Sequence, residues 1–197
     1  MMLVEQTTVP AAVLPVAALK NHLRLGTGFA DDGMQDTLVE SYLRAALAAI
    51  EGRTGKALIS RDFRWSLEDW RDGGEQALPV APVSRVVTVS LLNAQQIAEV
   101  VPANLYRLLQ DTHRPKIQAS GYLLPQVPMG GGIEIVFTAG FGPAWAEVPA
   151  DLAQAVMLLA AEYYERRHES DDRGLPFGVV TLIERWRTVR VLGGGAA

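Results

Sequence analysis

Hydrophobic positions in the first part of the chain recur at the spacing of α-helices. After Pro15, which suits the first position of a helix, apolar residues follow at Val16, Leu19 and Leu23. A stronger helix is predicted next, and it should end at Gly55. Two neighbouring apolar faces define it, one of Val39, Leu43, Ala46 and Ile50 and the other of Leu38, Tyr42, Ala45 and Ala49. An apolar surface this wide predicts contact with more than one neighbour.

The middle of the chain changes to the alternation of hydrophobic and polar residues that half-buried strands show. Phe63, Trp65 and Leu67 alternate with polar residues and predict one such strand. Further strands are predicted at residues 83–92 and 133–138, and weaker ones at 105–109 and 116–118. Glycine and proline residues separate these segments, and we interpret the glycines at 130–132 as a loop or hairpin turn.

Helical spacing returns after Pro149, where Leu152, Val156, Leu159 and Tyr163 share one face. A polar stretch and a short amphipathic segment follow. We therefore predict an α+β fold that is mainly α: a helical core with a small β-rich insertion between the second and third helices and a short C-terminal helix. The expected organisation is an N-terminal arm at 1–14, one domain at 15–176 with its β-rich part at about 60–140, and a C-terminal segment at 177–197.

The composition narrows the possible function classes. The chain has 197 residues, of which 49% are hydrophobic and 20% charged, enough for one domain with a true core. Its formal net charge of -4 offers no general attraction to nucleic acid or to an anionic membrane, and we expect no membrane-spanning helix. The absence of cysteine excludes disulfides, thiolate metal sites and cysteine nucleophiles, and it fits synthesis in a reducing cytoplasm.

Candidate catalytic and metal-binding motifs are weak throughout the sequence. The glycines at 26 and 28 follow a helix instead of a strand, so they do not form a phosphate-binding loop. Glu165 and His168 have the spacing of a helical metal pair, but the other histidines, His22 and His113, have no such partner. We therefore predict no catalytic residue, no metal and no cofactor. A helix-turn-helix DNA reader is disfavoured because acidic residues on the second helix would repel phosphate.

Five segments resemble those of one known protein family, in the same order and with similar spacing over about residues 16–190. Residues 93–130 resemble that family poorly. They are LKNHLRL at 19–25, AAIEGRTGKALI at 48–59, LPVAPV at 78–83, VFTAGFG at 136–142 and VPADLAQA at 148–155. Together they resemble the tailed-phage head–tail connector family, whose members are also called adaptors or head-completion proteins. Related versions occur in gene transfer agents.

The resemblance implies a structural subunit without enzymatic activity or cofactor. Such subunits form a closed ring beneath the twelve-fold portal, in the neck of a virion or phage-like particle made in the bacterial cytoplasm. The ring contacts the portal protein and the next neck or tail-completion protein. Double-stranded DNA passes through its lumen without specific binding, which a mildly negative chain suits. The alternative interpretation is a small soluble enzyme or ligand-binding module with a site in the β-rich region.

The C-terminal segment is the predicted portal-docking site. Val179, Ile183 and Trp186 recur at helical spacing, and aromatic residues and arginines are common interface anchors. The flanking residues that complete the predicted site are Arg185, Arg187, Val189 and Arg190. The alternative is that this short helix packs on its own subunit.

Overall fold

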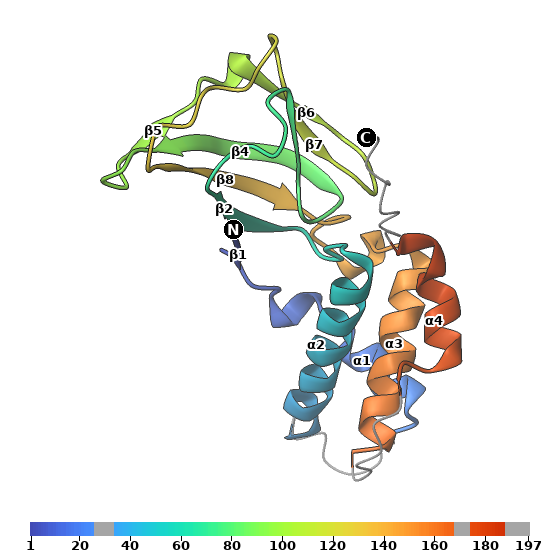
Figure 1. The fold of residues 1–197 in the computed structure, drawn as a ribbon. Coiled ribbons are helices and arrows are strands. Elements are labelled where there is room, and N and C mark those ends of the chain that lie inside the picture. Colours follow the sequence, from blue (N-terminus) through green and yellow to red (C-terminus); the bar gives the residue numbers. More distant parts are fainter. Residues whose placement is uncertain (26–33, 168–173, 188–197) are drawn as a thin grey trace.

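The computed structural model describes residues 1–25, 34–167 and 174–187, and it divides them into a helical half and a β half (Figure 1). The helices are α1 (Val16–His22), α2 (Met34–Thr54), α3 (Ala150–Glu165) and α4 (Phe177–Ile183). The strands are β1 (Met2–Glu5), β2 (Arg61–Leu67), β3 (Glu75–Ala77), β4 (Val83–Leu92), β5 (Ala98–Val100), β6 (Tyr106–Leu109), β7 (Lys116–Ala119) and β8 (Gly132–Ala139). Short 3-10 turns are η1 (Ala11–Val13), η2 (Ala103–Leu105), η3 (Trp145–Glu147) and η4 (Glu184–Trp186).

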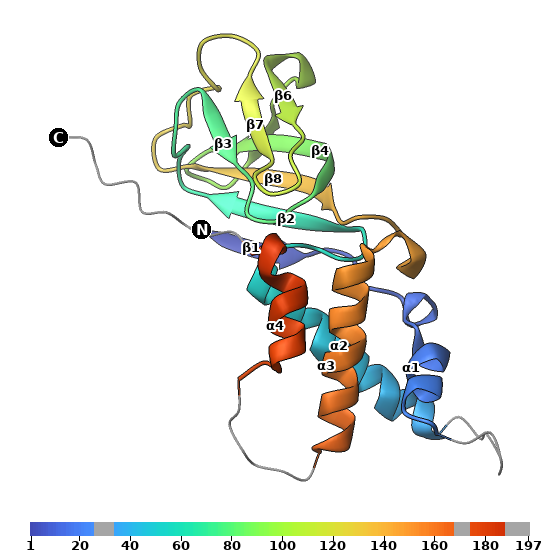
Figure 2. The same cartoon turned by 90° about the vertical axis from the view of Figure 1, so that its right-hand side faces the viewer.

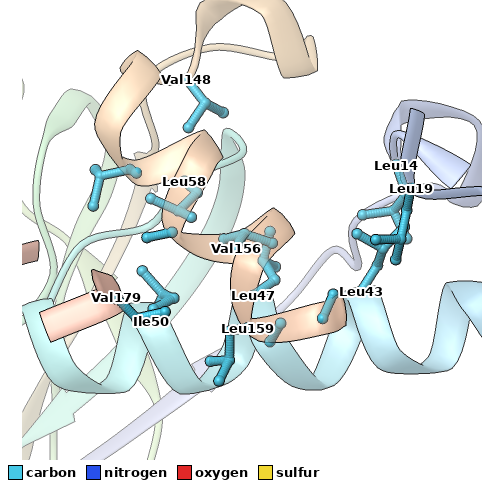
Figure 3. Close-up of a cluster of buried hydrophobic side chains, with 14 of the residues drawn as sticks. Leu14, Leu19, Leu43, Leu47, Ile50, Leu58, Val148, Val156, Leu159 and Val179 are labelled. Carbon is cyan, nitrogen blue, oxygen red and sulfur yellow. The ribbon is translucent and has the colours of Figure 1, made fainter. Parts of the chain in front are cut away.

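The helical half has one hydrophobic core, formed where α2 and α3 pack together with α1 and α4. The predicted regular face of α2 is confirmed, because Val39, Leu43, Ala46 and Ile50 are all fully buried. Figure 3 shows side chains from α2 and α3 meeting in this core, with Leu14 and Leu19 at one end and Val179 near the other. Burial of this apolar surface is the main stabilising contribution of the helical half.

Helix α2 ends where the sequence predicts it. Gly55 has a φ of 67°, in the left-handed region that glycine adopts without a Cβ penalty. Its N–H donates to the Glu51 carbonyl at 2.8 Å and so satisfies one carbonyl of the last turn. The chain then leaves the helix and enters the β half.

The β half contains two antiparallel sheets. The larger has the strand order β1-β2-β8-β4-β5, and the smaller has the order β3-β7-β6 and stands above it (Figure 2). Buried and half-buried residues alternate along β2 as its sequence predicts. Phe63 on β2 and its partner Phe137 on β8 stack with ring centroids 5.7 Å apart. These inward side chains form a second hydrophobic core, separate from the helical one.

The glycines before β8 form the predicted turn. Gly130 has a φ of 69°, which favours glycine. A Cβ on Gly131 would lie 1.9 Å from the Leu92 carbonyl oxygen, far inside contact distance. The chain therefore needs glycine here to bring β8 against β4.

The prediction that the fold is mainly α is wrong. Of the residues that the structure describes, 36% are helical and 27% are in strands, in a mixed α+β fold with two sheets. Strands β6 and β7 lie where the weaker strands at 105–109 and 116–118 were predicted, whereas β3 and β5 were not predicted. Strands as short as β3 and β5 contain too few alternating positions to stand out from loops. The segment predicted as an extended arm also contains β1, which forms a ladder with β2.

Candidate assembly interface

A buried ion-pair network joins the two halves at the end of α2. Both Nη atoms of Arg61 donate to the carboxylate of Glu51, at 2.9 and 2.7 Å, and Nη2 also donates to Glu5 Oε1 at 2.7 Å. The Leu58 N–H donates to Glu51 Oε1 at 2.7 Å. Burial alone lowers the pKa of Arg61, but the hydrogen bonds that Arg61 donates to Glu51 and Glu5 leave it above its ordinary value. Helix α2 and strands β1 and β2 are thereby fixed at one point.

The apolar stripe of the C-terminal segment lies inside the subunit. Val179, Ile183 and Trp186 are buried and belong to the hydrophobic core of the helical half. Figure 2 shows α4 lying beside α3, with which it packs. The alternative interpretation, packing on the same subunit, therefore describes these three side chains. In this conformation they present little surface to a partner.

Contacts from several elements hold Trp186 in place. Its indole N–H donates to Asp151 Oδ2, in the first turn of α3, at 2.7 Å. The ring centroids of Phe141 and His113 lie 5.4 and 6.0 Å from that of Trp186. Because His113 belongs to the turn between β6 and β7, the indole links the C-terminal segment to the β half. A large aromatic ring with its N–H satisfied is well suited to such a structural role.

Arg185 and Arg187, which were predicted to flank Val179, Ile183 and Trp186 in the docking site, are on the surface. The side chains of Arg185 and Arg187 are 69% and 50% exposed. Arg185 Nε forms an ion pair with Asp151 Oδ2 at 2.8 Å, so this carboxylate holds both the indole and a guanidinium. Val189 and Arg190 lie outside the described residues. Arg187 Nη1 lies 3.6 Å from Glu184 Oε2, so both arginines have carboxylate partners within the subunit. The described part of the segment therefore offers a partner exposed, paired charges and the exposed Phe177 ring.

Lys56 is an ionisable group that the sequence pattern did not single out. Its side chain is buried, with the residue 1% exposed, and Nζ has no hydrogen-bond partner among the described residues. Burial lowers the pKa of Lys56, and the negative charge of Asp111 partly opposes that change. Asp111 accepts hydrogen bonds from the N–H groups of Arg114 and His113, which lower its own pKa. The turn between β6 and β7 thus brings a carboxylate towards the buried lysine.

Two shallow grooves border strand β4. The first, of about 360 Å³, lies beside Pro82, Gln110 and Phe141. The second, of about 540 Å³, lies between β4 and β6 and includes Val87 and Leu109. Neither groove was predicted, because β6 is too short for the sequence to show which of its side chains face outwards. The available signal is the apolar residues, such as Val87 and Leu109, on the strands predicted at 83–92 and 105–109, but their pattern does not distinguish them from core residues.

The described residues contain no group of three or more histidine or acidic side chains placed to hold a metal ion. Glu165 is exposed at the end of α3, and His168, its suggested partner, lies outside the described residues. None of the helices in the described ranges is long and apolar enough to cross a membrane.

Solved structures of known particles resemble this chain over nearly its whole length. A chain from the neck of an empty gene transfer agent particle, computed with C6 symmetry, is 59% identical, with 98% of this chain and 99% of that chain covered and a TM-score of 0.91. A chain from the virion of a native gene transfer agent particle is 59% identical, with the same coverage and a TM-score of 0.88. A chain from the neck of a native particle, computed with C12 symmetry, is 54% identical over the same shares, with a TM-score of 0.86.

No protein-family model and no curated protein matches the chain. The fold and the matched structures define a structural protein of a particle neck, which supports the prediction that the chain is not an enzyme. The chain belongs to the head–tail connector family, as represented in gene transfer agents. The resemblance inferred from the five sequence segments is thereby confirmed.

Proposed function

We propose that this chain forms a twelve-subunit ring in the neck of a gene transfer agent particle, beneath the portal and above the next neck or tail-completion protein. The observation that carries the proposal is the 54–59% identity, over almost the full length, to chains of necks computed with C6 and C12 symmetry. At this level of identity the surfaces that make a ring are expected to be retained along with the fold.

The ring is proposed to extend the channel through which double-stranded DNA passes. A net charge of -4 favours this role, because a strongly basic lumen would hold phosphate groups whereas a neutral or mildly acidic one lets the duplex slide. The chain is expected to contact DNA without reading its sequence.

We assign docking on the portal to the C-terminal segment, in which the buried and the exposed side chains have different roles. Val179, Ile183 and Trp186 fix the segment to its own subunit, since all three are buried there. Arg185 and Arg187 remain exposed and supply the charged contact. Charged groups at an interface rim contribute orientation and association rate more than affinity, so a ring of such contacts suits assembly on a template.

The test of the proposed function is particle assembly in a producer strain that lacks this gene. We expect DNA-filled heads without attached tails, because the joint between portal and tail is missing, and complementation with the intact gene should restore tails. The measurement is a count of tailed and tailless heads by electron microscopy. Normal numbers of tailed particles in the deletion strain would refute the function.

The docking assignment has its own test, the double variant Arg185→Glu with Arg187→Glu. We expect a folded subunit that no longer joins heads to tails. Arg53→Glu is the matched control, because Arg53 is also exposed but lies on α2. Circular dichroism checks that both variants fold. If the double variant supports tailed particles as well as the control does, the portal contact lies elsewhere.

The alternative of an enzyme or ligand-binding module finds no support in the matched structures, which are parts of particles. The grooves of the β half are better explained as places where other protein surfaces pack.

A further inference from the structure

The two opposite edges of the five-stranded sheet both expose apolar side chains. Strand β1 forms one edge and pairs only with β2, whereas β4 and β5 lie at the other end of the strand order. Figure 1 shows β4, β8, β2 and β1 following one another across the sheet. Met2 and Leu3 are exposed on β1, and Val87 and Val100 are exposed on β4 and β5. One subunit therefore carries two different apolar surfaces that cannot meet each other.

The far edge contains the groove between β4 and β6. Strand β5 pairs only with residues 90–92 of β4, so the earlier part of β4 has no strand on that side. One side chain bridges the gap beside β6: Gln110 Nε2 donates to the Ser84 carbonyl at 3.0 Å. Next to this bridge the groove has a volume of about 540 Å³. Its wall of exposed apolar atoms includes Val87.

The ladder of β4 is irregular where it borders this groove. Its register against β8 shifts between Val83 and Arg85 and again between Val86 and Thr88. Bulges of this kind discourage the addition of a further strand. The groove is therefore suited to receive side chains from a protein surface, not a new strand in the sheet.

The charges at the two edges are opposite. Arg85 and Arg107 line the groove, and neither forms an ion pair among the described residues. Arg85 Nε donates to Thr138 Oγ1 at 3.1 Å, and Arg107 Nε donates to Gln118 Oε1 at 2.9 Å, so both guanidiniums are held in place by neutral groups. The Thr138 hydroxyl in turn donates to Asp62, but no carboxylate forms an ion pair with either guanidinium among the described residues. Such a positive rim favours an acidic partner surface.

An acidic loop flanks the β1 edge. The connection after β2 exposes Glu68, Asp69 and Asp72. With Arg71 as the basic residue among them, this loop has a net negative charge. Arg71 contacts the Met1 sulfur at 3.3 Å, which places this loop beside the start of β1. The β1 edge thus combines exposed apolar side chains with carboxylates, as the groove combines them with guanidiniums.

We propose that these two edges are the contact between neighbouring copies of this chain: the β1 edge, with Leu3 and Glu68, packs into the β4–β6 groove, with Val87 and Arg107, of the next subunit. A ring requires a head-to-tail contact between two different surfaces, and surfaces on opposite edges of one sheet meet that requirement. Every subunit makes two such contacts in a closed ring, so the contacts reinforce one another. This inference rests on the proposed ring function.

Cysteine cross-linking tests the contact directly, because the native chain has no cysteine. The double variant Leu3→Cys with Val87→Cys is assembled on purified portal and treated with a short bismaleimide. We expect a ladder of covalent oligomers on a denaturing gel, since each subunit joins both neighbours. The control pair is Leu38→Cys with Val87→Cys, because Leu38 is 42% exposed, close to the 40% of Leu3, but lies on α2. It should give no ladder.

Charge reversal gives a second, independent readout. We expect Arg107→Glu in the cross-linking background to reduce the ladder several-fold, because it places a carboxylate against the acidic loop. Adding Glu68→Arg should restore it, since every contact then has opposite charges again. Circular dichroism confirms that each variant is folded.

Electron microscopy of the same samples separates the possible outcomes. If rings are present but the Leu3 and Val87 pair gives no more cross-linking than the control, the contact is wrong while the ring function stands. If no ring forms on portal with the native chain, the proposed ring and this contact both fail.

Discussion

The helical half hides its apolar surface, whereas the β half displays it. Among the described residues, the exposed large hydrophobic side chains of the helical half are Leu38 and Phe177. The other eleven lie on β1 or elsewhere in the β half: Met1, Met2, Leu3, Val87, Ile97, Val100, Leu105, Leu109, Tyr122, Leu123 and Met129. Large exposed apolar surface marks sites of interaction. The β half therefore carries most of the exposed apolar surface that is suited to contact with a partner.

The wide apolar surface of α2 is explained in part by contacts within the subunit. Its second face is only partly used within the subunit: Tyr42 packs edge-on against Tyr164 of α3, with ring centroids 6.0 Å apart, whereas Leu38 is 42% exposed. Tyr42 therefore has its neighbour within the same chain. In the proposed ring, the sheet edges are the surfaces that contact neighbouring subunits.

The largest loss of stability is expected for Trp186→Ala. Trp186 is 7% exposed, and its removal leaves a cavity and takes one of two hydrogen-bond donors from Asp151 Oδ2, at a cost of about 3–5 kcal/mol. Phe177→Ala is the matched control on the same segment, because Phe177 is 86% exposed and should change stability by about 0.5 kcal/mol or less. Urea unfolding followed by circular dichroism measures both. Equal small losses would show that the C-terminal segment is not part of the helical core.

A second pair of variants tests the helical core on a single helix. Leu43→Ala should cost about 2–5 kcal/mol, because Leu43 is fully buried on α2. Leu38→Ala, on the exposed side of the same helix, should cost about 0.5 kcal/mol or less. Thermal unfolding distinguishes them. Similar losses for the two variants would mean that the exposed side of α2 also supports the fold.

The sequence predicted the long elements well and the short ones poorly. The faces of α2 and α3 and the alternation in β2 and β8 were identified because each extends over seven or more residues. Strands β1, β3 and β5 have three or four residues and depend on partners distant in the chain. Their pairing energy comes from neighbours that a local pattern does not contain.

The candidate docking site shows a different limit of prediction from sequence. The spacing of Val179, Ile183 and Trp186 correctly indicated a stripe that must be buried. A stripe buried in its own subunit and a stripe buried in an interface have the same sequence pattern, because both exclude water from apolar side chains. Only the fold, which places Asp151 and Phe141 around Trp186, separates the two.

Lys56→Met should stabilise the subunit at neutral pH by about 1–3 kcal/mol, because it removes a buried cation without a hydrogen bond. The lowered pKa of Lys56 means that the unfolded chain binds more protons between that pKa and 10.5, so native stability rises with pH in this window. The advantage of the variant should therefore shrink as pH approaches 10.5. Urea unfolding across this pH range measures it.

Lys116→Met is the control for that experiment, since Lys116 is partly exposed and pairs with Glu75 at 2.6 Å. It should not stabilise the subunit at neutral pH. A Lys56→Met variant that is less stable than the native chain at neutral pH would contradict the interpretation of Lys56 as an unsatisfied charge.

The smallest effect on folding is expected for Val87→Ser. Val87 is 44% exposed, so the free energy of unfolding should change by about 0.5 kcal/mol or less. Ring assembly on portal should nevertheless weaken, because the groove loses apolar contact with the neighbouring β1 edge. Light scattering with and without portal compares the variant with the native chain. Unchanged assembly would show that the groove is not a subunit contact.

An electron cryomicroscopy reconstruction of the neck, from particles that contain this chain, tests the central claim most directly. We expect twelve copies in a ring, with the β halves in contact through the β1 edge and the β4–β6 groove, and with each helical core enclosed in its own subunit. A ring joined through the helices, with both sheet edges facing solvent, would contradict the assignment of the β half as the assembling part. A neck without this chain would contradict its proposed function altogether.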